Sequence, residues 1–110
     1  MFKPGDVVVA DFIGEQGVKA RPVVVVSTDL YQAHRPDVVL AELTSNVAAA
    51  TAPTDYVLQD WAAAGLHRPS AFRLYLNTTN VGKVLALIGH LTDRDWAEVQ
   101  ARLRLGLAVM

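Results

Sequence analysis

The sequence predicts a mainly β domain that ends in one C-terminal helix. Short runs rich in Val, Ile and Leu recur along residues 6–91 and are separated by Gly, Pro, Asn and Ser, which is the pattern of strands joined by turns. After residue 92 the apolar positions change to helical spacing. A chain of 110 residues suits one domain, so we expect a single unit over residues 1–110, a small and strongly curved barrel or sandwich with the helix packed against it.

The apolar runs predict six strands. Their expected ranges are residues 6–12, 21–27, 37–44, 55–58, 70–77 and 83–91. The second run holds four consecutive valines and is expected to be the most deeply buried, with Pro22 at its beginning or at a bulge.

Glycine, proline and alanine predict the connections between the strands. Residues 13–19 contain Gly14 and Gly17 among polar residues and are expected to form a loop, as is the Ala-rich segment 47–53. Residues 61–66 are expected to form a single helical turn that ends at Gly65.

The terminal helix is predicted from its cap and its apolar face. Thr92 is a suitable N-cap, and Asp93 and Asp95 follow in the first turn, where carboxylates meet the positive end of the helix. The face expected to pack on the core consists of Trp96, Val99, Leu103 and Leu107.

Composition excludes several classes of protein. Apolar residues make up 52% of the chain and charged residues 19%, which is unlike a disordered protein. The absence of cysteine excludes disulfides and thiolate metal sites. The start of the chain lacks the apolar core of a signal peptide, and no run approaches the roughly twenty apolar residues that span a bilayer, so we expect a cytoplasmic protein without membrane contact.

The charge is unevenly distributed along the chain. The net charge of -1 argues against a generic nucleic-acid binder. Residues 1–61 hold eight acids and four bases, whereas residues 62–110 hold six bases and three acids. The second part therefore allows a local positive surface, and the alternative is solvated charge scattered over the molecule.

Common catalytic motifs are missing. The chain has no Gly-x-Ser-x-Gly elbow, no phosphate-binding Walker loop, no dinucleotide fingerprint and no His-Glu-x-x-His. His34, His67 and His90 are scattered, so we expect neither a metal site nor a cofactor.

Polar residues at strand ends are the candidates for chemistry. Arg21 enters the valine run directly after a glycine-containing loop, a position suited to an anion clamp, and the alternative is an arginine that caps a strand end or pairs with Asp11 or Glu15. The sequence Thr44-Ser45-Asn46 ends a strand with three hydrogen-bonding side chains, and the alternative is an ordinary turn.

Arg73 and Tyr75 stand two residues apart on a predicted strand and therefore share a face. A basic and an aromatic side chain at this spacing suit a phosphate and a stacked base. A partly exposed sheet face shows the same pair for packing reasons alone.

Five segments together resemble the MazF/PemK-like family of bacterial toxin endoribonucleases, in the same order and at similar spacing over nearly the whole chain. They are Lys3-Pro4-Gly5-Asp6-Val7-Val8, Ala20 to Ser27, Leu43-Thr44-Ser45-Asn46, Gly65 to Ser70, and Ile88 to Thr92 before the final helix.

The resemblance implies a small SH3-like β-barrel with a C-terminal α-helix, and a homodimer whose faces form an RNA groove. It implies the toxin of a type II toxin-antitoxin system, a growth-inhibiting, metal-independent endoribonuclease that cuts single-stranded mRNA by attack of the ribose 2′-hydroxyl. The implied partner is an acidic antitoxin, with DNA contacted only through the antitoxin complex.

The resemblance also implies roles for individual residues. Arg21 and Thr44 occupy the positions of the family's catalytic arginine and threonine. The residues expected to bind RNA are Lys19, Ser45, Asn46, Arg73 and Tyr75.

The sequence departs from the family pattern at two places. Tyr75 stands where some relatives carry a catalytic acid on the fifth strand, and residues 13–19 lack the histidine that some relatives have there. A subgroup that relies on Arg21 and Thr44 alone is one explanation. The alternative function is a catalytically weak or inactive relative that acts as a nucleic-acid or protein binding module.

Overall fold

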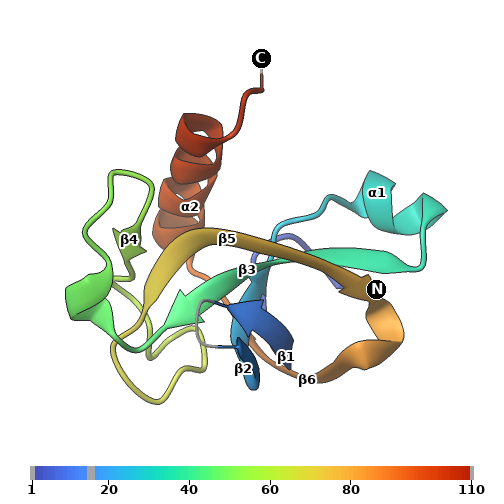
Figure 1. The fold of residues 1–110 in the computed structure, drawn as a ribbon, viewed down its shortest axis with the longest axis horizontal. Coiled ribbons are helices and arrows are strands. Elements are labelled where there is room, and N and C mark those ends of the chain that lie inside the picture. Colours follow the sequence, from blue (N-terminus) through green and yellow to red (C-terminus); the bar gives the residue numbers. More distant parts are fainter. Residues whose placement is uncertain (1, 15–16, 110) are drawn as a thin grey trace.

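The computed structural model describes residues 2–14 and 17–109, which form one curled antiparallel sheet and two α-helices (Figure 1). The strands are β1 (Asp6–Gly14), β2 (Gly17–Val25), β3 (Asp37–Thr44), β4 (Tyr56–Val57), β5 (Ala71–Asn80) and β6 (Val84–His90). The helices are α1 (Asp29–His34) and α2 (Asp93–Gly106), with 3-10 turns η1 (Val47–Ala49) and η2 (Val81–Lys83). The strand order is β4-β5-β3-β2-β1-β6, so the sheet is a half-barrel with β4 and β6 at its edges. The predicted mainly β class with a C-terminal helix is confirmed.

The hairpin of β1 and β2 replaces the loop predicted at residues 13–19. Pairing continues through Ile13 with Val18 and Gly14 with Gly17, because two β-branched residues face each other across the strands and Gly17 takes a positive φ of 95° at the turn. The loop prediction was therefore wrong for the described residues. Residues 15–16, including Glu15, lie outside them.

Pro22 lies inside β2, opposite Val9, rather than at the beginning of the strand or at a bulge. β2 pairs with β3 only at Val23–Val25. Proline has no backbone N–H to donate. Because Pro22 lies just outside the segment paired with β3, no hydrogen bond between the strands is lost there.

Helix α1 was not expected from the sequence. It is short, and Thr28 caps it by accepting a hydrogen bond from the Tyr31 backbone N–H at 3.2 Å. Residues 61–66 form the expected turn, in which the Ala64 N–H bonds to the Asp60 carbonyl and Gly65 takes a φ of 89°.

The alternating residues of the strands form two core clusters on opposite faces of the sheet. The first cluster lies between the sheet and α2, where Trp96, Val99 and Leu103 pack as predicted, whereas Leu107 caps the helix and is exposed. The second cluster consists of Val8, Ala10, Phe12, Val23, Val25, Val38 and Leu40. Neither helix in the described ranges is long and apolar enough to cross a bilayer.

Candidate functional site

A cavity opens where β2 and β3 separate. These strands pair only between Val23–Val25 and Leu40–Glu42, and beyond this pairing they diverge. The opening has a volume of about 520 Å³. Its lining comes from β2, the end of β3, the segment after β3, the loop before β5 and the start of β5.

Strand alternation turns the polar side chains toward this cavity. On β2, Lys19 and Arg21 share the face of Val23, and on β3, Glu42 and Thr44 share the face of Leu40. Val23 and Leu40 belong to the second core cluster. One face of the sheet is therefore apolar along most of its length and polar at the end that borders the cavity.

Six of the seven predicted site residues line the cavity. They are Lys19, Arg21, Thr44, Ser45, Asn46 and Arg73. They come from segments far apart in the chain, so their convergence is a result of the fold.

The structure does not bring Tyr75 into the cavity. Its ring meets the buried Phe12 ring edge to face, with centroids 6.2 Å apart, and packs against the second core cluster. The cause is a β-bulge: Ala41 pairs with Leu76 whereas Glu42 pairs with Arg73, so β5 carries two additional residues between the two pairs. Tyr75 lies on the same face of the sheet as Arg73, but over the apolar part of that face.

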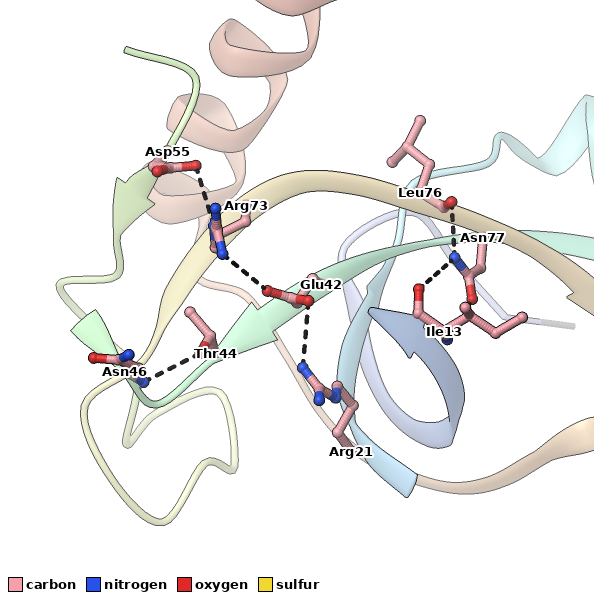
Figure 2. Close-up of polar contacts among 9 residues, drawn as sticks. All are labelled: Ile13, Arg21, Glu42, Thr44, Asn46, Asp55, Arg73, Leu76 and Asn77. Atoms are coloured by element: carbon pink, nitrogen blue, oxygen red, sulfur yellow. Dashed lines mark hydrogen bonds and ion pairs between the residues drawn. The ribbon is translucent and has the colours of Figure 1, made fainter. Parts of the chain in front are cut away.

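Glu42 is a cavity residue that the sequence analysis missed. Its Oε2 accepts a hydrogen bond from Arg21 Nη1 at 3.3 Å, and its Oε1 lies 3.9 Å from Arg73 Nη1 (Figure 2). Asp55 Oδ1 lies 3.7 Å from Arg73 Nε. The sequence held one indication of this residue, because Glu42 is an acid within an otherwise apolar stretch of β3. Arg21 thus pairs with an acid on another strand, whereas Asp11, one of the two partners proposed from the sequence, is exposed on β1.

The Thr44 hydroxyl accepts a hydrogen bond from the Asn46 backbone N–H at 3.1 Å. Because its oxygen is the acceptor in this bond, its own hydrogen can point elsewhere. The predicted turn and the predicted site therefore coincide: the turn fixes the oxygen, and the hydroxyl can still donate to a ligand.

Basic side chains dominate the cavity. The lining includes four bases, Lys19, Arg21, Arg68 and Arg73, and one acid, Glu42. His67 also lines it. Such a surface favours an anion, and guanidinium groups are suited to phosphate oxygens. Across the described ranges, no three His, Asp or Glu side chains are grouped as metal ligands would be.

The loop that carries His67 and Arg68 is held by a close backbone contact. A Cβ on Gly65 would lie 2.1 Å from the Ile88 carbonyl oxygen of β6, so only glycine fits there. This contact fixes the start of the loop next to the sheet.

Comparison with known proteins gives one family match and one relative of similar length. A family model described as "PemK-like, MazF-like toxin of type II toxin-antitoxin system" matches residues 3–107. The Endoribonuclease EndoA of Bacillus subtilis (strain 168) is 30% identical over 114 residues, covering 100% of this chain and 97% of the relative.

Solved structures share the fold at lower identity. An endoribonuclease in complex with its cognate antitoxin, from a mycobacterial species, has a TM-score of 0.78 and 22% identity, with 100% of both chains covered. The Mycobacterium tuberculosis toxin MazF-mt6 has a TM-score of 0.71 and 21% identity, covering 89% of this chain and 91% of its own.

Proposed function

The chain belongs to the PemK-like, MazF-like toxins of type II toxin-antitoxin systems, and on this basis we propose that it cleaves single-stranded RNA at the cavity between β2 and β3. The predicted class, an endoribonuclease, is confirmed by the family and by the relative EndoA. The observation that carries the proposal is the convergence of Arg21 and Thr44 in one cavity rich in basic side chains.

The proposed reaction is an attack of the ribose 2′ oxygen on the adjacent phosphorus. The new bond joins the 2′ oxygen to phosphorus, and the bond from phosphorus to the 5′ oxygen of the next nucleotide breaks. The 2′-hydroxyl loses its proton to a base, and the leaving 5′ oxygen gains one. The products are a cyclic phosphate and a 5′-hydroxyl, and the nucleophile belongs to the substrate itself, so the reaction needs no metal-bound water.

Arg21 and Thr44 have distinct parts in this reaction. The Arg21 guanidinium donates to the phosphate oxygens, where negative charge increases in the transition state. The Thr44 hydroxyl, whose oxygen is fixed by the Asn46 N–H, donates to a phosphate oxygen or relays a proton. Lys19, Arg73 and the polar side chains after β3 hold the flanking RNA through phosphate and base-edge contacts.

The proposed active form is a homodimer in the cytoplasm that acts on mRNA and is inhibited by an acidic antitoxin. Support for an interface comes from β6, an edge strand whose Leu85 and Leu87 are 63% and 58% exposed. An edge strand with exposed apolar side chains can pair with another chain and bury them there. The antitoxin proposal rests on the family description.

The test is incubation of the purified protein with a long RNA of mixed sequence in EDTA, followed by mapping of the new 5′ ends. Discrete cuts with 5′-hydroxyl ends are expected from the wild type and should be lost in Arg21→Ala and Thr44→Ala. Arg73→Ala should weaken RNA binding regardless of sequence.

Arg35→Ala is a matched control, since Arg35 pairs with Asp37 outside the cavity lining and its side chain is 59% exposed. It should cleave like the wild type. Intact RNA from folded, dimeric wild-type protein free of antitoxin would overturn the proposal and favour a binding module without catalysis.

A further inference from the structure

Glu42 is a buried carboxylate at the border between the apolar and polar parts of the sheet. The residue is 3% exposed, and its neighbours on the same face of β3, Val38 and Leu40, are fully buried. Moving a carboxylate out of water is costly unless charged or hydrogen-bonding partners compensate. The partners that stabilise Glu42 therefore indicate what the residue is for.

Those partners are arginines on the two strands beside β3. The sheet order places β3 between β5 and β2, so Arg73 approaches Glu42 from one side and Arg21 from the other. Figure 2 shows the carboxylate between the two guanidinium groups, with one oxygen toward each. Two guanidinium groups this near to a shared point would repel each other without the carboxylate.

The backbone of β1 restricts the carboxylate further. A Cβ on Gly14 would lie 3.0 Å from Glu42 Oε2 and 3.7 Å from Arg21 Nη1. The pair therefore packs directly beneath Gly14 and has little room to rearrange. Guanidinium groups lie beside both carboxylate oxygens, with Arg21 Nη1 3.3 Å from Oε2 and Arg73 Nη1 3.9 Å from Oε1.

We propose that Glu42 is a positioning residue that holds the Arg21 and Arg73 guanidiniums together on one wall of the cavity, so that both address the same stretch of RNA backbone. The inference rests on the proposed nuclease function. Glu42 acts through the arginines and does not touch the substrate. Some relatives have a catalytic acid at the position of Tyr75. In this chain the acid between the two arginines is Glu42 on β3, and it positions them.

The first test is Glu42→Gln, which keeps the shape of the side chain and removes its charge. We expect kcat to fall by about 10- to 100-fold, since small displacements of a group that contacts the transition state have effects of this size. KM should stay within about threefold of the wild-type value. The pH profile of kcat/KM should keep its shape, because no proton-transfer group is lost.

A second variant, Gly14→Ala, keeps every charge and only crowds Oε2. The backbone at Gly14 has no positive φ, so alanine is compatible with its conformation. We expect a smaller fall in kcat than in Glu42→Gln. Asp37→Asn is the matched control: it removes an acid that pairs with an arginine away from the cavity, and kcat should not change.

An arginine deletion tests whether Glu42 acts through Arg21. In an Arg21→Ala background, Glu42→Gln should add little to the loss, because the group being positioned is already absent. Full additivity of the two effects would overturn the inference. So would wild-type kcat in Glu42→Gln, or the loss of one limb of the pH profile, which would make Glu42 a base.

A readout without RNA separates this inference from the nuclease proposal. NMR of the arginine side-chain Nε–H groups should show ordered guanidiniums for both Arg21 and Arg73 in the wild type and increased motion in Glu42→Gln. The increase should be larger for Arg21, because Asp55 still pairs with Arg73 Nε. If the wild type did not cleave RNA, the nuclease proposal would fail and this measurement would still decide whether Glu42 fixes the two arginines. Unchanged guanidinium order would overturn the inference.

Discussion

The buried carboxylates Asp95 and Glu42 differ in the kind of partner that each has. Asp95, at the start of α2, is fully buried and accepts hydrogen bonds from the Tyr56 hydroxyl at 2.6 Å and from the backbone N–H groups of Gln59 and Asp60 at 3.1 and 2.8 Å. Glu42 faces guanidinium groups beside an open cavity. Asp95 therefore fixes the path of the chain, whereas Glu42 fixes the position of charged side chains.

The difference shows that burial of an acid does not by itself indicate a functional site. Neutral backbone donors around Asp95 tie the segment after β4 to the helix, which is a structural task. Cationic partners that border an open space, as around Glu42, can also contact a ligand. The type of donor and the presence of a cavity together separate the two cases.

The largest expected effect on stability is that of Asp95→Ala. It leaves two backbone N–H groups and the Tyr56 hydroxyl without their acceptor, so we expect a loss of about 3–5 kcal/mol in the free energy of unfolding. Urea unfolding would measure it. Asp93→Ala, at an exposed position of the same helical turn, should cost less than about 1 kcal/mol. A similar loss for both variants would contradict the structural role of Asp95.

Tyr56→Phe tests the same network with a smaller effect. It removes one donor to Asp95 and should cost about 1–2 kcal/mol. Burial and then the bond to Asp95 raise the pKa of Tyr56 from 10.0 to about 12. This contribution to stability is present below pH 10 and is lost as the pH rises toward 12. Urea unfolding between pH 9 and pH 12 should show a weaker alkaline decline for Tyr56→Phe, and an unchanged decline would contradict this assignment.

Glu42→Gln should cost about 1–2 kcal/mol, less than Asp95→Ala, because the glutamine carbonyl can still accept a hydrogen bond from an arginine. The Arg21 and Arg73 side chains are 19% and 26% exposed, so water from the cavity can solvate them when the carboxylate charge is removed. The same urea experiment measures this value. A loss as large as that of Asp95→Ala would mean that Glu42 is mainly structural.

The smallest effect is expected at Asp60. Hydrogen bonds from Arg94 and Thr92 lower the pKa of its carboxyl from 3.8 to about 2. A lowered pKa adds stability above pH 3.8 that is lost as the pH falls toward 2, so Asp60→Asn should reduce this part of the acid dependence. The difference in unfolding midpoint between pH 4 and pH 2 would show it, and high salt should shrink it. A difference that is the same in high salt would argue against the ion pair.

The strands were largely predictable because β-branched and other apolar residues come in short runs bounded by Gly, Pro, Asn and Ser. The third strand was predicted with the bounds that the structure shows, Asp37–Thr44. The loop prediction at residues 13–19 failed because glycine was interpreted as a strand breaker although Ile13 and Val18 continue the pairing. Helix α1 was missed because six residues with one cap give little periodic signal.

The site was most predictable where local sequence resembled a family. Arg21 and Thr44 lie in such segments, and both line the cavity. Glu42 was missed because its partner Arg21 is 21 residues away, and only the sheet order brings β3 between β2 and β5. Tyr75 was predicted to accompany Arg73 from their spacing of two residues, and its position outside the cavity could not be predicted because a bulge of two residues leaves no mark in the sequence.

The charged side chains in the cavity between β2 and β3 differ in their exposure, so dissolved salt should affect them differently. Lys19 and Arg68 are exposed at the cavity, whereas the Arg21 and Glu42 pair is largely withdrawn from solvent. Dissolved salt screens exposed charges and competes for phosphate contacts, but it screens withdrawn pairs much less. Potassium chloride should therefore raise KM while leaving kcat nearly constant, so that salt separates the capture of RNA from its cleavage.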